Sequence, residues 1–344
     1  MDIDIMLSSR HSKSTCFNLA IGEPHFLSKH IINIISIVEP ILEMGYPQLG
    51  GEPELIHEIN HLIPEYKYIV VTNGAKQAIS AALYAFKQDW VHHFKHKGQV
   101  GVLSGTGRKS VYHSAPYWPS FPTLASLMDM SFHSSNKDYM DIDIVTSPNN
   151  PDGTVCKDYC PDIWDASYYN PVFPVYNRQQ TKLLAQAATF SAAKMIGTSG
   201  LRVGWLATNS EEIYKNASAY VEKSTTGVST QAQWQISSIL RHIRLFGCQE
   251  LFKKATQELI NNSLDFLARL DPYIDMYSGA PEGMFAFFKV KDLERFANAL
   301  VESKVQMIPG KACGMKEDGW YRASLGVSNK TLNETCSALL EKLK

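Results

Sequence analysis

The chain has 344 residues, of which 44% are hydrophobic and 19% are charged, and its formal net charge is -1 at pH 7. This length exceeds the usual size of one compact domain and predicts two unequal domains. The near-neutral charge gives no basis for a nucleic-acid partner, so small molecules are the expected ligands. Six cysteines are far fewer than a disulfide scaffold of this size would carry, and we expect reduced thiols.

The chain carries no recognisable targeting, membrane or metal-binding signal. Its first residues, Met1 to Met6, are acidic and lack the basic-then-apolar order of a secretory signal. No uninterrupted apolar run approaches membrane-spanning length. We therefore expect a cytoplasmic protein without membrane contact. Cys156 and Cys160, together with His113, could supply metal ligands, but no second close pair accompanies them, so no metal is expected.

Predicted strands and helices alternate from about residue 68. Tyr68 to Thr72 predicts a buried strand, Asn73-Gly74 a turn, and Ala75 to Phe86 a helix with an apolar stripe. Further short apolar runs predict strands at Gln99 to Leu103, Asp143 to Thr146, Ile163 to Ala166, Ala187 to Ser191 and Leu201 to Ala207. Such a series favours an α/β fold with a mostly parallel sheet covered by helices.

The pattern becomes helical from about Glu211, and Ser229 to Leu270 is expected to form more than one helix. The remainder predicts a smaller α+β domain, with strands at Met284 to Val290, Val305 to Ile308 and Trp320 to Leu325, and helices at Asp292 to Ser303 and Lys330 to Leu343. We assign residues 41–235 to a large domain, and residues 1–40 together with 236–344 to a small domain.

One segment, residues 191–205 (SAAKMIGTSGLRVGW), places a lysine between a hydroxyl and an arginine in a glycine-rich turn. Lys194, bound as an imine to an aldehyde, would hold a cofactor covalently, while Ser191 and Arg202 could bind an attached phosphate. The alternative is a surface lysine beside a glycine-rich turn. The segment resembles the Schiff-base segment of the fold-type I pyridoxal-phosphate (PLP) enzymes, the aspartate aminotransferase superfamily.

That resemblance implies PLP as the cofactor. It also implies the fold-type I architecture, a large domain with a mostly parallel central sheet flanked by helices plus a smaller α+β domain. Lys194 would then have a second role, because its amine, once displaced by substrate, can move a proton between the substrate Cα and the cofactor.

Residues 73–78 (NGAKQA) follow a predicted strand and open a predicted helix, where backbone N–H groups and the helix dipole favour an anion. An ordinary turn is the alternative. The segment resembles the family's first phosphate-binding turn, in which Ala75 and Lys76 would supply the amides.

An aromatic cluster occupies a proline-bounded loop at residues 115–121 (APYWPSF), and flat rings suit stacking on a flat cofactor. By resemblance to the family, Trp118 would cover one face of the pyridine ring, with Tyr117 as the second candidate. Packing in a hydrophobic core is the alternative.

Two polar segments follow predicted strands. Residues 146–153 (TSPNNPDG) resemble the family's Asn-Pro-x-Gly signature, which implies that Asn150 contacts substrate and donates to the phenolic oxygen of PLP. Asp165, at the end of the next strand, would pair with the pyridine nitrogen and keep it protonated. Tyr168 would hydrogen-bond the phenolic oxygen. The alternatives are an ordinary turn for residues 146–153 and a helix-capping aspartate for Asp165.

Three further segments extend the resemblance over most of the chain. Residues 46–51 resemble the segment whose tyrosine, here Tyr46, reaches the phosphate of the neighbouring subunit, which implies a homodimer with shared active sites. Residues 321–326 resemble the strand whose arginine, here Arg322, binds the substrate α-carboxylate in a bidentate fork. Residues 18–24 resemble the stretch that closes over the substrate, with Gly22 near the carboxylate.

Within the superfamily, the motifs look most like the plant alliinase and tryptophan aminotransferase group. The chain lacks the Cys-rich N-terminal module of alliinases, a departure that weakens the case for C–S lysis. Only fourteen residues separate Asn150 from Asp165, too few for the helix and strand that many relatives have there. We therefore expect the sheet to lose a peripheral element.

We expect a PLP-dependent aminotransferase that moves an amino group from an L-amino acid to a 2-oxo acid, and the aromatic loop at 115–121 favours an aromatic or other apolar substrate. The first alternative is a PLP-dependent lyase of the C–S or β-eliminating type, or a cyclase or decarboxylase. The reaction depends on which Cα bond lies perpendicular to the ring. The second alternative is a non-catalytic PLP-fold binding protein, which predicts loss of Asp165, Lys194 or Arg322, and all three are present.

Overall fold

The structure of the protein is a computed structural model that describes residues 17–28, 31, 45–96, 110–138, 141–171, 182–278 and 283–344. The strand predicted at Gln99 to Leu103 lies outside the described residues. The same is true of much of the N-terminal part assigned to the small domain, and the domain boundaries stay predictions.

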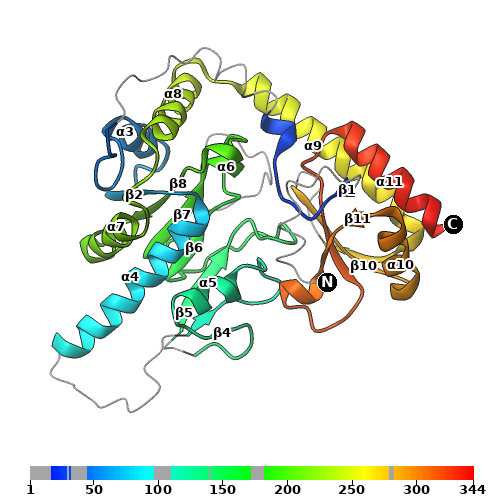
Figure 1. The fold of residues 1–344 in the computed structure, drawn as a ribbon, viewed down its shortest axis with the longest axis horizontal. Helices are drawn as coiled ribbons and strands as arrows, with labels where there is room; N and C mark the ends of the chain where they lie inside the picture. The colour runs from blue at the N-terminus through cyan, green and yellow to red at the C-terminus, as the bar shows by residue number, and fades with distance from the viewer. Residues whose placement is uncertain are drawn as a thin grey trace.

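Among the described residues, one sheet has seven strands in the order β2-β8-β7-β6-β5-β3-β4 (Figure 1). The bounds are β2 Tyr68–Thr72, β3 Val111–Tyr112, β4 Phe132–His133, β5 Ile142–Thr146, β6 Ile163–Asp165, β7 Ala187–Ser191 and β8 Gly204–Thr208. Strand β8 is antiparallel to both of its neighbours, and every other adjacent pair is parallel. The predicted α/β fold with a mostly parallel sheet is confirmed.

Helices cover both faces of this sheet, because successive side chains of a strand point to opposite faces. Val70 and Leu206 pack in one hydrophobic cluster with helices on the first face, whereas Val71 and Trp205 pack in another cluster on the second. The helices of the first face are α4 Ala75–His96, α5 Phe121–Leu127 and α7 Glu211–Thr225, and those of the second are α3 Pro53–Leu62 and α8 Thr230–Phe246. The sheet is thus the buried centre of the large unit.

A smaller unit forms around an antiparallel sheet of four strands in the order β12-β13-β10-β9. Its elements are α9 Gln249–Leu270, β9 Ile274–Ser278, β10 Phe285–Val290, α10 Leu293–Ser303, β11 Val305–Gln306, β12 Ile308–Pro309, β13 Trp320–Ser324 and α11 Asn329–Leu343. Helices α9 and α11 contact each other and lie side by side in Figure 1. The helical segment that begins at Thr230 divides at Gly247 and Cys248 into α8 and α9, as predicted.

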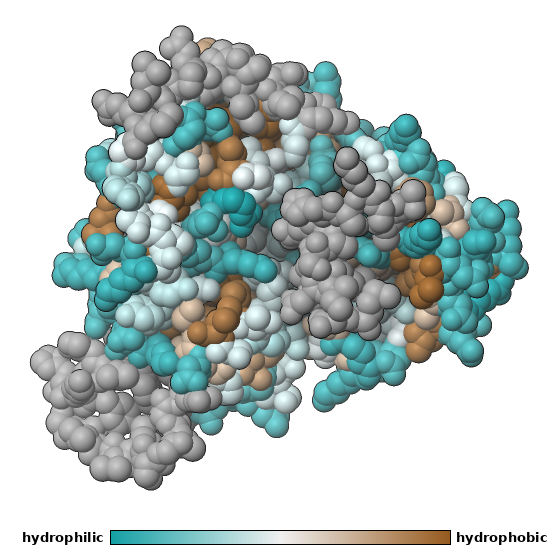
Figure 2. Space-filling model, viewed as in Figure 1, coloured by the Kyte–Doolittle hydropathy of each residue, from teal (hydrophilic) through white to brown (hydrophobic). Residues whose placement is uncertain are grey.

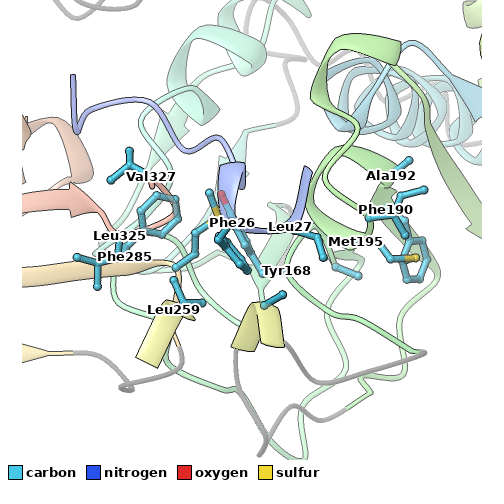
Figure 3. Packing of buried hydrophobic residues seen from close by; sticks show 14 of the residues in the cluster. Phe26, Leu27, Tyr168, Phe190, Ala192, Met195, Leu259, Phe285, Leu325 and Val327 are labelled. Atoms are coloured by element: carbon cyan, nitrogen blue, oxygen red, sulfur yellow. The ribbon is translucent and has the colours of Figure 1, made fainter. Parts of the chain in front are cut away.

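Residues 17–28 join the two units. Strand β1 (Phe17–Asn18) pairs in parallel with β11 of the small unit. At the other end of the segment, the Ser28 hydroxyl donates to the carbonyl oxygen of Gly197 in the large unit. Figure 3 shows Phe26 of this segment among buried side chains contributed by both units. The N-terminal segment therefore closes over the junction.

Three sequence-based expectations need correction. The helix that begins at Ala75 ends at His96 rather than at Phe86. Strand β8 begins at Gly204 rather than at Leu201, because residues 199–201 form a 3-10 turn and Arg202 has a positive φ of 54°. The run predicted as one strand at Val305 to Ile308 is two short strands, of which β11 pairs with β1 and β12 pairs with β13.

The short connection between Asn150 and Asp165 joins two strands that are direct neighbours in the sheet. Residues 151–162 form neither helix nor strand, and β5 and β6 pair directly in parallel. A parallel crossover needs about a dozen residues or more, and residues 147–162 meet that length. The connection therefore contains neither helix nor strand, as its length implied, and the loss of a peripheral sheet element relative to other family members stays a prediction.

No helix in the described part of the chain is long and apolar enough to cross a membrane. On the face shown in Figure 2, hydrophobic residues form separate patches within a mainly hydrophilic surface.

Candidate functional site

Five strands present their carboxyl ends at one edge of the large sheet. Strands β3, β5, β6 and β7 are parallel, and β2 runs in the same direction because β8 is antiparallel to both β2 and β7. In open α/β sheets, ligands bind at this edge. The segments that leave these strands carry Ala75 and Lys76 after β2, Trp118 after β3, Asn150 after β5, Asp165 and Tyr168 at β6, and Lys194 after β7.

A cavity of about 590 Å³ lies at this edge, a size typical of a small-molecule site. The predicted site residues that line it are Gly22, Ala75, Lys76, Trp118, Asn150, Asp165, Tyr168, Ser191, Lys194, Arg202 and Arg322. Tyr46 and the second aromatic candidate, Tyr117, do not line it. The structure therefore brings together eleven residues that are scattered from position 22 to position 322, while their individual roles stay predictions.

One end of the cavity, which we call the anion-binding end, combines a helix N-terminus with a guanidinium and is suited to an anion. Helix α4 begins here at Ala75, and its first turn contains no acidic residue. The helix N-terminus carries a partial positive charge. Gly74 has a φ of +79°, and a Cβ atom at this position would lie 2.6 Å from Nη2 of Arg202. The missing side chain thus lets the guanidinium approach the start of the helix. Nη1 of Arg202 also donates to the carbonyl oxygen of Ser199, at 3.0 Å.

Lys194 lies in the short helix α6 (Ala192–Met195), directly after β7. Its Nζ donates a hydrogen bond to the carbonyl oxygen of Gly22 from the N-terminal segment. A Cβ atom on Gly22 would lie 2.8 Å from Cζ of Phe285 and 3.8 Å from Nζ of Lys194. Glycine therefore allows the N-terminal segment to pack closely against the Phe285 ring, beside the lysine amine.

Asp165 is buried at the end of β6. Its Oδ1 accepts hydrogen bonds from the backbone N of Ser167 at 3.1 Å and from the Ser167 hydroxyl at 2.6 Å. Its Oδ2 lies 3.3 Å from Oγ1 of Thr146. Burial raises the pKa of this carboxyl above its ordinary value, although the hydrogen bonds from Ser167 and Thr146 oppose the rise. A cationic N–H group in the cavity would stabilise the ionised form.

A hydrogen-bonded chain links three further residues of the cavity wall. Nδ2 of Asn150 donates to the Tyr168 hydroxyl at 3.1 Å, and Nη1 of Arg322 donates to Oδ1 of Asn150 at 2.8 Å. Nη2 of Arg322 donates to the carbonyl oxygen of Ala20, and the guanidinium lies 4.3 Å from the ring centroid of Phe285. Burial raises the pKa of Tyr168 and lowers the pKa of Arg322.

The guanidinium of Arg322 is buried, and its Nε has no hydrogen-bond partner within the described part of the chain. A buried cation with an unsatisfied donor is costly unless an anion reaches it. A planar guanidinium fork beside a cavity is well suited to a carboxylate. The arrangement therefore offers a carboxylate site at the end of the cavity formed by the small unit.

The two aromatic candidates occupy different places. Trp118 lines the cavity, packs edge-on against Phe121 at 5.4 Å, and has Nζ of Lys76 at 5.5 Å from its ring centroid. Tyr117 does not line the cavity and instead packs edge-on against Phe132 at 4.8 Å. The geometry favours Trp118 over Tyr117 as the residue that can stack on a ligand.

Tyr46 does not line the cavity of its own chain. Its side chain is 89% exposed, and the nearby Leu49 is 63% exposed. Both belong to the segment before α3. The position leaves Tyr46 free to contact another chain, as the resemblance implies.

Phe285 and Ser167 also line the cavity, and no sequence motif singled them out as site residues. Phe285 was included in a predicted strand, but nothing in the sequence links it to Arg322, since the antiparallel pairing of β10 with β13 brings them together. Ser167 lies between Asp165 and Tyr168 in the sequence, and its hydroxyl donates to Oδ1 of Asp165. Within the described ranges, no three His, Cys, Asp or Glu side chains are grouped to hold a metal ion.

Comparison with solved structures supports the fold. An aspartate aminotransferase from Thermotoga maritima superposes with a TM-score of 0.71 and 21% identity, covering 98% of this chain and 95% of that chain. An aromatic aminotransferase from Pyrococcus horikoshii OT3 gives a TM-score of 0.72 and 18% identity, with 100% of both chains covered. The chain therefore has the aminotransferase fold that the sequence resemblance implied.

Two curated proteins show similarity in sequence. Tryptophan aminotransferase-related protein 2 of Arabidopsis thaliana is 25% identical over 304 residues, which cover 78% of this chain and 64% of that protein. Alliin lyase of Allium cepa var. aggregatum is 31% identical over 202 residues, which cover 55% of this chain and 42% of that protein. The chain thus spans less than two thirds of the length of either relative.

A protein-family profile described as Allinase (Alliinase_C) matches residues 52–263. This segment holds the anion-binding end of the cavity, the aromatic loop, the Asn150 turn, Asp165 and Lys194. Membership of this family implies dependence on PLP. Because the match covers more than half of the 344 residues, the chain belongs to the allinase family.

Proposed function

We propose that the chain is a PLP-dependent aminotransferase that moves an amino group from an L-amino acid to a 2-oxo acid. The observation that carries this proposal is the convergence of Lys194, Asp165 and Arg322 on one cavity. An amine, a buried carboxylate and a buried guanidinium are the groups needed to hold the cofactor and the substrate carboxylate.

The residues present fit PLP. The anion-binding end, with the start of α4, Lys76, Ser191 and Arg202, would hold its phosphate. Asp165 would face the pyridine nitrogen, and Asn150 and Tyr168 would hold the phenolic oxygen. PLP bound in this way supplies an electron sink that stabilises the charge left when a bond to the substrate Cα breaks.

The chain's own groups then have separate tasks. The Asp165 carboxylate holds a proton on the pyridine nitrogen, because its burial makes a cationic partner favourable. The Arg322 fork binds the substrate α-carboxylate and fixes the orientation of Cα. The Lys194 amine, once released by the substrate, takes a proton from Cα as a general base. Ile21, Trp118 and Phe285 line the same cavity and give apolar surface for an aromatic or other apolar side chain.

The direct test is addition of one amino acid at a time to the PLP-loaded protein without any 2-oxo acid. An aminotransferase releases at most one equivalent of 2-oxo acid per active site, converts the cofactor to its amine form, and resumes turnover when a 2-oxo acid is added. Failure of every L-amino acid to change the cofactor spectrum would contradict the proposal and would favour a non-catalytic binding protein.

A second candidate function is a PLP-dependent lyase that eliminates the β-substituent of its substrate. The similarity to an alliin lyase, 31% over 202 residues, favours it. In the same experiment a lyase releases ammonia over many turnovers without an added 2-oxo acid and leaves the cofactor in its starting form. Ammonia release therefore separates the two candidates.

We further propose a homodimer in which Tyr46 of each subunit reaches the phosphate site of the other, in the cytoplasm. The support is the 89% exposure of Tyr46 together with its absence from the lining of the cavity of its own chain. Light scattering should give the mass of a dimer. Mixing Lys194→Ala with Tyr46→Ala protein should create dimers with one intact site, and no recovery of cofactor affinity on mixing would contradict shared sites.

A further inference from the structure

A second cavity, of about 380 Å³, is lined by strands β3 and β5, by the segment that connects β5 to β6, and by Lys137 from the segment before β5. Its volume falls within the range of small-molecule sites. None of the described residues lines both this cavity and the one that holds Lys194, which we call the first cavity. The second cavity therefore needs a ligand of its own.

The sheet face at the second cavity is polar. Tyr112 of β3 pairs in register with Asp143 of β5. Asp143 and Val145 lie on one face of the sheet, because the side chains of a strand alternate. Val145 packs against the hydrophobic cluster of the second face, the face that α3 and α8 cover elsewhere. At β5 this otherwise apolar face thus carries a buried carboxylate.

The wall of the second cavity presents one cation and one anion. Nζ of Lys137 donates to Oδ2 of Asp143 and to the Tyr159 hydroxyl, both at 2.7 Å, and this hydroxyl donates to the same Oδ2. An ammonium has three N–H donors, and these bonds use two of them. Oδ1 of Asp143 takes part in none of these bonds. Burial raises the pKa of Cys156 and lowers the pKa of His113, so both line the cavity as neutral groups at neutral pH.

Asn149 adds a buried acceptor to the same wall. Its side chain is largely buried, and its Nδ2 donates to the carbonyl oxygen of Pro116 at 3.0 Å and to Oδ1 of Asp152 at 2.8 Å. These two acceptors fix the orientation of the amide. Its Oδ1 has no hydrogen-bond partner among the described residues. A buried acceptor without a partner is costly, so this wall favours a ligand with an N–H donor.

We propose that the second cavity is a binding site for a free amino acid with an apolar side chain. The ammonium group of the ligand would donate to Asp143 and Asn149, and its carboxylate would accept from Lys137. An α-amino acid carries both charges on one carbon atom, which suits a wall whose cation and anion are hydrogen-bonded to each other. A phosphate or a polyamine carries one sign of charge and would leave the other charge of the wall without a complement.

The rest of the wall suits the side chain of such a ligand. Tyr112, Val145 and Val155 line the cavity and offer apolar surface. L-phenylalanine is therefore a suitable probe, since its ring can contact this surface while its charged groups meet the polar wall. The inference goes beyond the proposed function and does not depend on it, because PLP would occupy the first cavity.

The test is equilibrium dialysis of labelled L-phenylalanine with the PLP-loaded protein after reduction with borohydride. Reduction fixes the cofactor to Lys194 and prevents reaction there. We expect two bound equivalents per chain, of which Arg322→Lys weakens one and Lys137→Gln weakens the other. A single equivalent that Arg322→Lys weakens and Lys137→Gln leaves unchanged would overturn the second site.

The variants are chosen to change the second cavity alone. Lys137→Gln keeps a donor for Asp143 but loses the charge, so the affinity of the second equivalent should fall about tenfold, the effect of one charge-assisted hydrogen bond. Val155→Phe adds volume on the apolar side and should weaken the same equivalent. Lys157→Gln is the matched control, because Lys157 is exposed and does not line the cavity. An equal loss in this control would overturn the assignment.

Two analogues of the probe separate its charges. 2-Phenylethylamine lacks the carboxylate and 3-phenylpropanoate lacks the ammonium group. Each should bind to the second cavity about tenfold more weakly than L-phenylalanine, and Lys137→Gln should not weaken binding of the amine further. Equal affinity of the wild type for the amine and for L-phenylalanine would overturn the proposal and would indicate a site for amines.

The outcomes also separate this site from the proposed function. A protein that takes up no PLP contradicts the proposed function, yet the equivalent that depends on Lys137 should still be measured in the same dialysis. A protein that takes up PLP and binds L-phenylalanine equally in the wild type and in Lys137→Gln contradicts only the second site.

Discussion

Arg322 offers the sharpest quantitative prediction for substrate binding. Its two terminal nitrogens donate to Asn150 at 2.8 Å and to the carbonyl oxygen of Ala20, and its Nε has no partner in the described part of the chain. Arg322→Lys keeps the positive charge but replaces the planar fork with a single ammonium, so a substrate carboxylate loses one charged hydrogen bond. Such a bond contributes about 1.5–3 kcal/mol, which corresponds to roughly a 10- to 150-fold loss of amino-acid affinity.

The assay is a titration of the PLP-loaded protein with the amino acid that changes its spectrum most, followed by visible absorption. Affinity for PLP should change little, because the proposed phosphate contacts are Lys76, Ser191 and Arg202 and do not include Arg322. Arg269→Lys is the matched control, since Arg269 pairs with Asp265 in α9 outside the cavity. Unchanged amino-acid affinity in Arg322→Lys, or an equal loss in the control, would refute the assignment of the carboxylate site.

Two further variants test the other parts of the cavity. Burial raises the pKa of Asp165 in the folded protein, so the folded state binds the carboxyl proton more tightly than the unfolded chain does. The free energy of unfolding of the cofactor-free protein should therefore fall as pH rises through that raised pKa. Asp165→Asn cannot ionise, so thermal melts of this variant across pH should show no such fall in stability. Its affinity for PLP should also decrease. The same fall in stability in the wild type and in Asp165→Asn would contradict this. Gly74→Ala should lower PLP affinity by about tenfold or more, because its Cβ would meet Arg202 at 2.6 Å in a left-handed backbone. Equilibrium dialysis that gives an unchanged affinity would contradict the anion-binding role of this end.

Local patterns predicted the elements that position the cofactor residues. The strand at Ala187 to Ser191 has the predicted bounds, because it is a short apolar run buried on both faces of the sheet. The turn at Asn73-Gly74 and the start of α4 also lie where predicted. Both features depend on residues that are neighbours in the sequence, so their signals are local.

The features that escaped prediction depend on contacts between distant segments. His113 and Thr146 are 33 residues apart and meet because β3 and β5 are adjacent in the sheet. His113 drew attention in the sequence only as an improbable metal ligand. Phe285 and Arg322 meet through the pairing of two antiparallel strands. The missing crossover helix could be read from the short segment before Asp165, but the direct pairing of β5 with β6 could not, because strand order is a tertiary property.

The central claim is that Lys194 binds PLP covalently and releases it to an amino acid. The most direct measurement is the visible absorption of the purified protein with PLP, before and after adding L-amino acids one at a time, in parallel with Lys194→Ala. The account predicts a lysine-bound absorption band in the wild type that one amino acid converts to the amine form of the cofactor, and no such band in Lys194→Ala. A wild type without the band, or the same band in Lys194→Ala, would contradict the account.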